Sequence, residues 1–257
     1  MGKPTGFLDY VRMDCPLRDA AERVQDYAPA AIPVSEKNRR RQSGRCMDCG
    51  VPFCQAGVRF EGELLGCPLH NLIPEWNDLL WNGNYEGALQ RLRKTSPFPE
   101  ITGRVCPALC ERACVCGRIS EPVTVRENEL AIAEYGFEND LIQPCVPQVR
   151  SDRKIAVIGS GPAGLAAAYY LNRRGHTVTV FEKDAVPGGL LTYGIPEMKL
   201  PKCVVARRIA LLTQEGITFR PSCCVGTDIS AQELAEQYDL VIFCCGAQQP
   251  RPLPCAE

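Results

Sequence analysis

Histidine, excess charge of one sign and long apolar runs are all scarce in this 257-residue sequence, and each shortage excludes a class of protein. Only two histidines occur, His70 and His176, so histidine-rich zinc sites are excluded. A formal net charge of -1 provides no global field for nucleic acid or an anionic membrane. No apolar run approaches the roughly 18 residues that span a bilayer, and the N-terminus lacks a secretory signal pattern. We therefore expect a cytoplasmic protein with no nucleic-acid or membrane partner.

Cysteine, by contrast, is abundant, with 16 residues in the chain. Because the cytosol keeps thiols reduced, we interpret this abundance as metal ligation and not as a disulfide framework. Half of the cysteines form two closely spaced groups: Cys46, Cys49, Cys54 and Cys67 in the first, and Cys106, Cys110, Cys114 and Cys116 in the second. Thiolates spaced like this can converge on one inorganic core. The three-residue gaps in the second group favour iron-sulfur clusters over zinc.

The remaining cysteines show no ligand spacing, and we interpret them as buried or incidental thiols. They are Cys15, Cys145, Cys203, Cys223, Cys224, Cys244, Cys245 and Cys255. A basic run, Lys37, Arg39, Arg40, Arg41 and Arg45, is typical of a solvated helix face, and we assign it no role. We interpret His70 as a surface residue beside Cys67.

Between the two cysteine groups, apolar residues recur at three- and four-residue steps over residues 72–94, which predicts helix. Gly83 and Asn84 should divide this stretch into two helices, which we interpret as the scaffold that brings the cysteine groups together. A further helix is expected over residues 125–137, and it contains Glu129. The proline-containing segment 143–148 is predicted to be a linker, so we place a domain boundary after residue 145.

Beyond the linker, strands and helices alternate around a glycine-rich turn. Residues 154–158 and 176–181 are predicted strands, with a helix over 165–174 between them. The turn has the pattern G-x-G-x-x-G and consists of Gly159, Ser160, Gly161, Pro162, Ala163 and Gly164. Its glycines permit a tight turn, a close approach to a pyrophosphate and helix-strand packing, and helix N-terminal amides would hold the anion. Glu182, about 20 residues further on, should accept from a ribose 2′-hydroxyl, which favours FAD or NAD over NADP.

The rest of the chain continues the same alternation. Residues 188–196 are predicted to form a loop and residues 207–212 a helix. A strand over 217–220, a helix over 230–237 and a buried strand over 240–244 should extend the sheet. The predicted fold class is therefore α/β.

Several stretches resemble the N-terminal half of the small subunit of NADPH-dependent glutamate synthase. They are residues 45–54, 66–69, 73–77, 98–110 and 122–124, the glycine-rich turn, and residues 188–196. Dihydropyrimidine dehydrogenase and the large subunit of ferredoxin-dependent transhydrogenases share the same electron-input module. The resemblance implies an N-terminal α-helical iron-sulfur domain over residues 1–145, followed by a partial Rossmann-like FAD-binding domain over residues 146–257.

The resemblance also implies two [4Fe-4S] clusters with interleaved ligands. One would be held by Cys46, Cys49, Cys54 and Cys114, and the other by Cys67, Cys106, Cys110 and Glu129. From spacing alone, Cys116 could compete with Cys114 or replace Glu129. The implied FAD site consists of Gly159, Ser160, Gly161, Pro162, Ala163, Gly164, Glu182, Lys183, Gly189, Leu190, Val225, Gly246 and Ala247.

The function implied by the resemblance is electron transfer. NAD(P)H would reduce FAD, which passes single electrons to the clusters and on to a larger subunit that forms glutamate from glutamine and 2-oxoglutarate. Family members continue into a second dinucleotide domain for NADPH, and this sequence has no second fingerprint. We therefore expect NADPH to bind only where another chain supplies that domain, and the chain alone not to oxidise NADPH. The alternatives are a non-catalytic iron-sulfur relay or binding module, and the input module of a related transhydrogenase or dihydropyrimidine dehydrogenase type enzyme.

Overall fold

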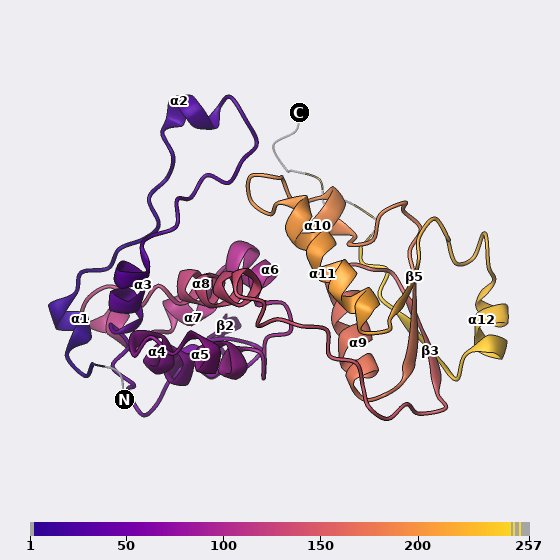
Figure 1. The fold of residues 1–257 in the computed structure, drawn as a ribbon, viewed down its shortest axis with the longest axis horizontal. Helices are drawn as coiled ribbons and strands as arrows, with labels where there is room; N and C mark the ends of the chain where they lie inside the picture. The colour runs from indigo at the N-terminus through magenta and orange to yellow at the C-terminus, as the bar shows by residue number, and fades with distance from the viewer. Residues whose placement is uncertain (1–2, 248, 250–251, 253–257) are drawn as a thin grey trace. The chain divides into compact units, whose positions relative to one another are not determined.

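The computed structural model describes residues 3–247, 249 and 252, so Cys255 lies outside the described residues. The chain divides into two compact units (Figure 1). The first contains Met1–Gln143 and Pro196–Val204, and the second contains Pro144–Ile195 and Val205–Glu257. Among the described residues, no helix has the length and apolar character to cross a membrane.

The first unit is mostly helical and includes one short antiparallel hairpin. Its helices are α1 (Gly6–Asp9), α2 (Ala20–Arg23), α3 (Glu36–Ser43), η1 (Phe53–Gln55), α4 (Ile73–Trp81), α5 (Tyr85–Leu92), α6 (Pro99–Val105), α7 (Leu109–Arg112), η2 (Val115–Arg118) and α8 (Val125–Glu138). The hairpin pairs β1 (Val58–Phe60) with β2 (Glu63–Leu65).

The predicted helical stretch between the cysteine groups is confirmed as α4 and α5. Gly83 has a φ of +78°, and the Asn84 side chain accepts from the amide of Gly87, which begins α5 immediately after the break. Trp76 and Leu80 on α4 are fully buried, as is Ile132 on α8. Burial of these large apolar side chains supplies the main stabilisation of the unit.

The interpretation of the basic run as a solvated face is wrong for two of its members. Arg39 and Arg45 are 4% and 0% exposed. Arg39 donates to Asn128 and to the carboxylate of Glu127 at 3.1 Å, and Arg45 donates to the carbonyl of Glu121 at 2.8 Å. These partners lie more than 70 residues further along the chain. A pattern of charges within one short segment therefore could not predict that these arginines are buried.

The second unit is built on a four-stranded parallel sheet of strand order β5-β4-β3-β6. The elements of this part of the chain are β3 (Lys154–Ile158), α9 (Pro162–Arg173), β4 (Thr177–Phe181), α10 (Leu190–Tyr193), α11 (Lys202–Gln214), β5 (Thr218–Arg220), α12 (Ala231–Gln237) and β6 (Leu240–Phe243). The predicted alternation is confirmed, with three differences. The strand over 240–244 was predicted to be buried, which is wrong: β6 is the edge strand next to β3, and its Leu240 and Phe243 are 49% and 66% exposed. Helix α9 begins at Pro162, where proline's fixed φ suits the first turn, and the expected loop over 188–196 contains the short helix α10.

The two faces of the sheet are covered by different helices (Figure 1). Helices α9 and α11 lie on one side, and α12 lies on the other. On the α12 side, Ala156, Ile158 and Phe181 form a buried cluster with Leu234. The chain order reverses between β3 and β6, and in such sheets ligands bind at the carboxyl ends of the strands flanking that point.

Candidate functional site

The first group of candidate metal ligands gathers around one cavity. Cys46 and Cys49 lie in the loop after α3, Cys54 lies in η1, and Cys114 immediately precedes η2. All four line the same cavity, together with Cys116. The fourth candidate ligand therefore comes from a segment far from the other three in sequence.

The thiols of this first set are close enough to influence one another. Burial raises the pKa of Cys46 to about 12, and it also raises the pKa of Cys54, with further contributions from Cys46, Cys114 and Cys49. A hydrogen bond with Cys116 lowers the pKa of Cys114. Because metals bind thiolates, a metal cluster bound here would displace protons from the buried thiols.

A second set is formed by Cys67, Cys106, Cys110 and Glu129. Cys67 follows β2, Cys106 follows α6, Cys110 lies in α7 and Glu129 lies in α8. Burial raises the pKa of Cys110, and the charges of Cys67, Glu129 and Cys106 contribute to that rise. Glu129 is 7% exposed, burial raises its pKa to about 7, and it accepts a hydrogen bond from Thr102. A buried carboxyl with a single neutral hydrogen-bond donor is suited to a cationic ligand.

The two sets have the donor chemistry of iron-sulfur sites. Each holds four donors, and each draws on both cysteine groups of the sequence. Within the described part of the chain, no three His, Cys, Asp or Glu side chains converge as they would on a single metal ion. In a [4Fe-4S] cluster each ligand binds a different iron, so the ligand atoms are spread around a larger core. The residues present therefore fit such clusters.

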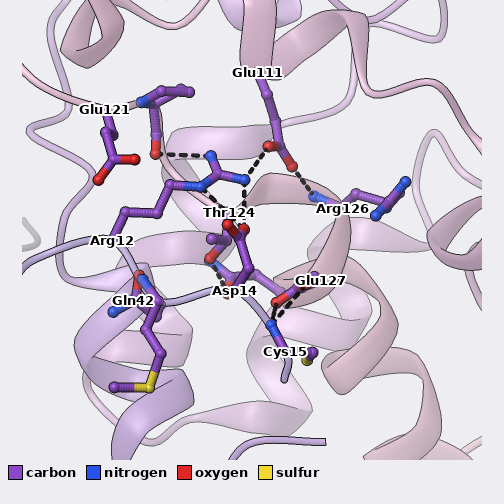
Figure 2. A network of polar contacts seen from close by, with 12 residues as sticks. Arg12, Asp14, Cys15, Gln42, Glu111, Glu121, Thr124, Arg126 and Glu127 are labelled. Carbon is purple, nitrogen blue, oxygen red and sulfur yellow. Dashed lines mark hydrogen bonds and ion pairs between the residues drawn. The ribbon is translucent and has the colours of Figure 1, made fainter. Parts of the chain in front are cut away.

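A polar network holds the segment between the two sets in place (Figure 2). Glu111 lies between Cys110 and Cys114; it accepts from Arg12 at 2.9 Å and from the amide of Arg126 at 3.0 Å. Arg12 also donates to the carbonyl of Pro122 at 3.1 Å. Neither Arg12 nor Glu111 was predicted from the sequence to have a role. The position of Glu111 between two candidate ligand cysteines was a usable signal, whereas nothing in the local sequence distinguished Arg12.

In the second unit, the glycine-rich turn joins β3 to α9 at the carboxyl end of β3. Gly159 has a φ of +99°, and a Cβ there would lie 2.5 Å from the carbonyl oxygen of Cys244. A Cβ on Gly164 would lie 1.9 Å from the carbonyl oxygen of Gly159. A Cβ on Gly161 would meet nothing within 4 Å. The first and third glycines are thus required by packing, and the second leaves open space beside the helix N-terminus.

Ser160 connects three parts of this site. Its amide and hydroxyl both donate to the buried carboxylate of Glu182, and its hydroxyl also accepts from the amide of Gly188 at 2.8 Å. A Cβ on Gly189 would lie 2.9 Å from the Cα of Gly161, so this loop lies directly against the turn. Glu182 also accepts from the amide of Asp184 at 3.0 Å. A carboxylate has about four lone-pair positions, which leaves it room for a further donor.

The other residues predicted to bind the nucleotide have different surroundings, and not all of them lie beside the glycine-rich turn. Leu190 is 70% exposed at the start of α10, next to Gly189. Lys183 follows Glu182 and forms an ion pair with Asp184. Gly246 and Ala247 follow Cys244, whose amide donates to the carbonyl of Ile158 at 2.7 Å. Val225 packs instead against the buried cluster on the α12 side of the sheet.

Two protein families match separate parts of the chain. Residues 23–141 match the family described as dihydropyrimidine dehydrogenase domain II, 4Fe-4S cluster. Residues 157–207 match the family described as NAD(P)-binding Rossmann-like domain. An iron-sulfur domain followed by a dinucleotide-binding Rossmann-like domain is the predicted order, and it is confirmed.

Curated relatives match nearly the whole chain. The glutamate synthase [NADPH] small chain of Bacillus subtilis is 54% identical over 254 residues, 98% of this chain and 51% of the relative. That of Azospirillum brasilense is 38% identical over 96% of this chain and 50% of the relative. Glutamate synthase [NADH] of Saccharomyces cerevisiae is 46% identical over 98% of this chain and 11% of the relative. The chain spans about half the length of the small chains that it matches. Over nearly its whole length the chain is therefore similar to about half of a glutamate synthase small chain, and it matches an iron-sulfur domain followed by a NAD(P)-binding Rossmann-like domain.

Proposed function

We propose that this chain is the electron-input module of a glutamate synthase type oxidoreductase. Electrons from NAD(P)H would pass through FAD in the second unit to two [4Fe-4S] clusters in the first. They would continue to a larger subunit that forms glutamate from glutamine and 2-oxoglutarate. The observation that carries the proposal is the presence, in one chain, of two separate four-donor sets and a glycine-rich turn linked through Ser160 to Glu182.

In this proposal the iron-sulfur domain covers residues 1–145. Cys46, Cys49, Cys54 and Cys114 hold one cluster, and Cys67, Cys106, Cys110 and Glu129 hold the other. The bound clusters supply one-electron chemistry. The chain's own residues fix the donor atoms: Cys54 and Cys110 are each 8% exposed, and the polar network around Glu111 holds the segment that carries Cys110 and Cys114.

The FAD-binding domain covers residues 146–257. The amides at the start of α9 would bind a pyrophosphate in the open space beside Gly161, and Glu182 would accept from a ribose hydroxyl. Through its hydrogen bonds, Ser160 would hold the Glu182 carboxylate and the Gly188–Gly189 loop in position beside the turn. NADPH would bind to a second dinucleotide domain, whose glycine-rich fingerprint does not occur within these 257 residues.

The test is the absorption spectrum of the chain purified without oxygen. We expect a broad iron-sulfur shoulder together with the resolved bands of an oxidised flavin, and about eight iron atoms per chain. A colourless protein that cannot be reconstituted with iron and sulfide would overturn the iron-sulfur assignment. Mixing the loaded chain with the large subunit of a glutamate synthase and following complex formation by gel filtration tests the partner.

A second candidate function is an iron-sulfur relay that does not hold flavin. It is favoured by one observation: the Glu182 carboxylate already accepts from the amide and hydroxyl of Ser160 and from the amide of Asp184. In that case the spectrum would show the shoulder without flavin bands, and added FAD would not co-elute with the chain.

A further inference from the structure

The first candidate cluster site contains a fifth thiol that the ligand assignment does not use. Cys116 lies in η2, two residues after Cys114, and is 2% exposed. It lines the same cavity as Cys46, Cys49, Cys54 and Cys114. A cysteine can be buried for packing alone, so its contacts decide whether it has a role in the site.

Among the described residues, the side chain of Cys116 interacts with groups of this first site. Its side chain hydrogen-bonds that of Cys114, its thiol donates to the carbonyl of Arg45 at 3.5 Å, and the amide of Met47 is directed at its sulfur. It also interacts electrostatically with Cys46. Arg45 and Met47 flank Cys46, so Cys116 lies against the loop that supplies two of the four ligands.

Within the part of the chain that the structure describes, no comparable interaction connects Cys116 to the second set. The charged neighbours that influence Cys110 are Glu111, Cys67, Glu129 and Cys106, and those that influence Cys67 are Glu129 and Cys106. Of the two roles that spacing allows for Cys116, the structure therefore favours one at the position of Cys114 and gives no support to one at Glu129.

We propose that Cys116 is a reserve ligand of the cluster bound by Cys46, Cys49, Cys54 and Cys114, able to take the place of Cys114 on iron. This inference rests on the proposed function, because it requires a cluster at the first set. In the exchange, the bond from Cys114 to iron breaks, the bond from Cys116 to iron forms, and the thiol proton of Cys116 passes to Cys114. No electron is transferred, and no reagent from outside the site is needed.

The geometry suits this exchange. The two side chains are already hydrogen-bonded, so the proton has a direct path between the sulfurs. Because both cysteines belong to one short turn of chain, exchange would need only a local adjustment of η2.

The test compares Cys114→Ala, Cys116→Ala and the double variant, each reconstituted without oxygen and assayed for iron and by EPR after reduction. We expect both single variants to keep about eight iron atoms per chain and the double variant to keep about four. Cys114→Ala should show altered g values for one cluster. Cys54→Ala is the matched control: Cys54 belongs to the same set, but no described cysteine outside the set is hydrogen-bonded to its thiol, so this variant should fall to about four iron atoms.

If Cys114→Ala loses as much iron as the double variant while its circular dichroism matches wild type, the proposal is wrong. A wild-type chain that binds no iron would overturn both the proposed function and this inference. Iron loss in the Cys114→Ala variant alone would overturn only this inference, so the two failures can be distinguished. A second measurement does not depend on the folding of Cys114→Ala: with excess chelator, Cys116→Ala should lose one cluster several-fold faster than wild type, because a released iron site is no longer recaptured. Equal rates would contradict the proposal.

Discussion

Arg12 and Glu111 are separated by 99 positions in the sequence and form an ion pair of 2.9 Å (Figure 2). Their side chains are 16% and 15% exposed. Through this pair the N-terminal segment is fixed to the part of the chain that lies between Cys110 and Cys114. This ion pair therefore helps to position both Cys110 and Cys114, which are candidate ligands of the two proposed clusters.

Replacing Arg12 with Met should lower the free energy of unfolding by roughly 1–3 kcal/mol, because it removes charge-assisted hydrogen bonds to Glu111 and to the Pro122 carbonyl. Denaturant unfolding of the reconstituted chain measures the change. Arg112→Met is the matched control: Arg112 pairs with Glu63 at 2.8 Å, but the two side chains are 60% and 64% exposed. That variant should change stability by less than about 1 kcal/mol. If the two substitutions lowered the free energy of unfolding equally, the Arg12–Glu111 pair would contribute no more to stability than an exposed ion pair.

Replacing Glu129 with Ala should alter the EPR signal of one reduced cluster and leave the other unchanged, because Glu129 lies only with the second set of donors. Glu134→Ala provides the control on the same helix, since Glu134 forms an ion pair with Arg104 at 2.8 Å. Its spectrum should match wild type. Unchanged signals for both clusters in the Glu129 variant would refute its assignment as a ligand.

Arg45 is fully buried, and its charge interacts with Cys116 and Cys114. Replacing it with Met removes a positive charge beside the first cluster, which disfavours the reduced, more negative state. We expect the midpoint potential of one cluster to fall by on the order of tens of millivolts. Arg45→Lys keeps the charge and should stay closer to wild type in an EPR-monitored redox titration. An unchanged potential in the Met variant would exclude this electrostatic effect.

Substitutions at two of the three turn glycines, Gly161 and Gly164, should distinguish an effect on ligand binding from an effect on folding. Gly161→Ala adds a methyl group where nothing lies within 4 Å, so thermal unfolding of the flavin-free chain should be unchanged. Its flavin content should fall about tenfold or more, because the methyl group occupies the space that a pyrophosphate needs. Gly164→Ala places a Cβ 1.9 Å from a backbone oxygen and should destabilise the fold by roughly 1–3 kcal/mol or more. Full flavin retention in Gly161→Ala would place the pyrophosphate elsewhere.

Much of the second unit was predictable because its signals are local. The apolar run of β3, the glycine pattern and the run of β4 follow one another within 28 residues, from Lys154 to Phe181, and each reports on its own backbone conformation. The exposure of β6 was not predictable in this way, because it depends on the position of the strand at the sheet edge. The other two differences are local. Pro162 starts α9 earlier than periodicity indicates, and α10 forms inside a segment whose glycines predicted a loop.

The first unit depended more on tertiary structure. Spacing identified the cysteine groups, and the resemblance to a known family suggested how they divide into two sets, but the position of Cys116 beside Cys114 and Cys46 appears only in the folded chain. The burial of Arg39 and Arg45 and the pairing of Arg12 with Glu111 were likewise absent from the sequence reading.

The sequence by itself determined the chemistry that is available: thiols at ligand spacing, a glycine-rich turn and an acidic residue after the second strand. Only the tertiary structure decided which of these groups meet. The physical reason is that spacing and periodicity report on neighbours along the chain, whereas burial and ion pairing join residues such as Arg12 and Glu111 that are brought together by the packing of α3, α7 and α8.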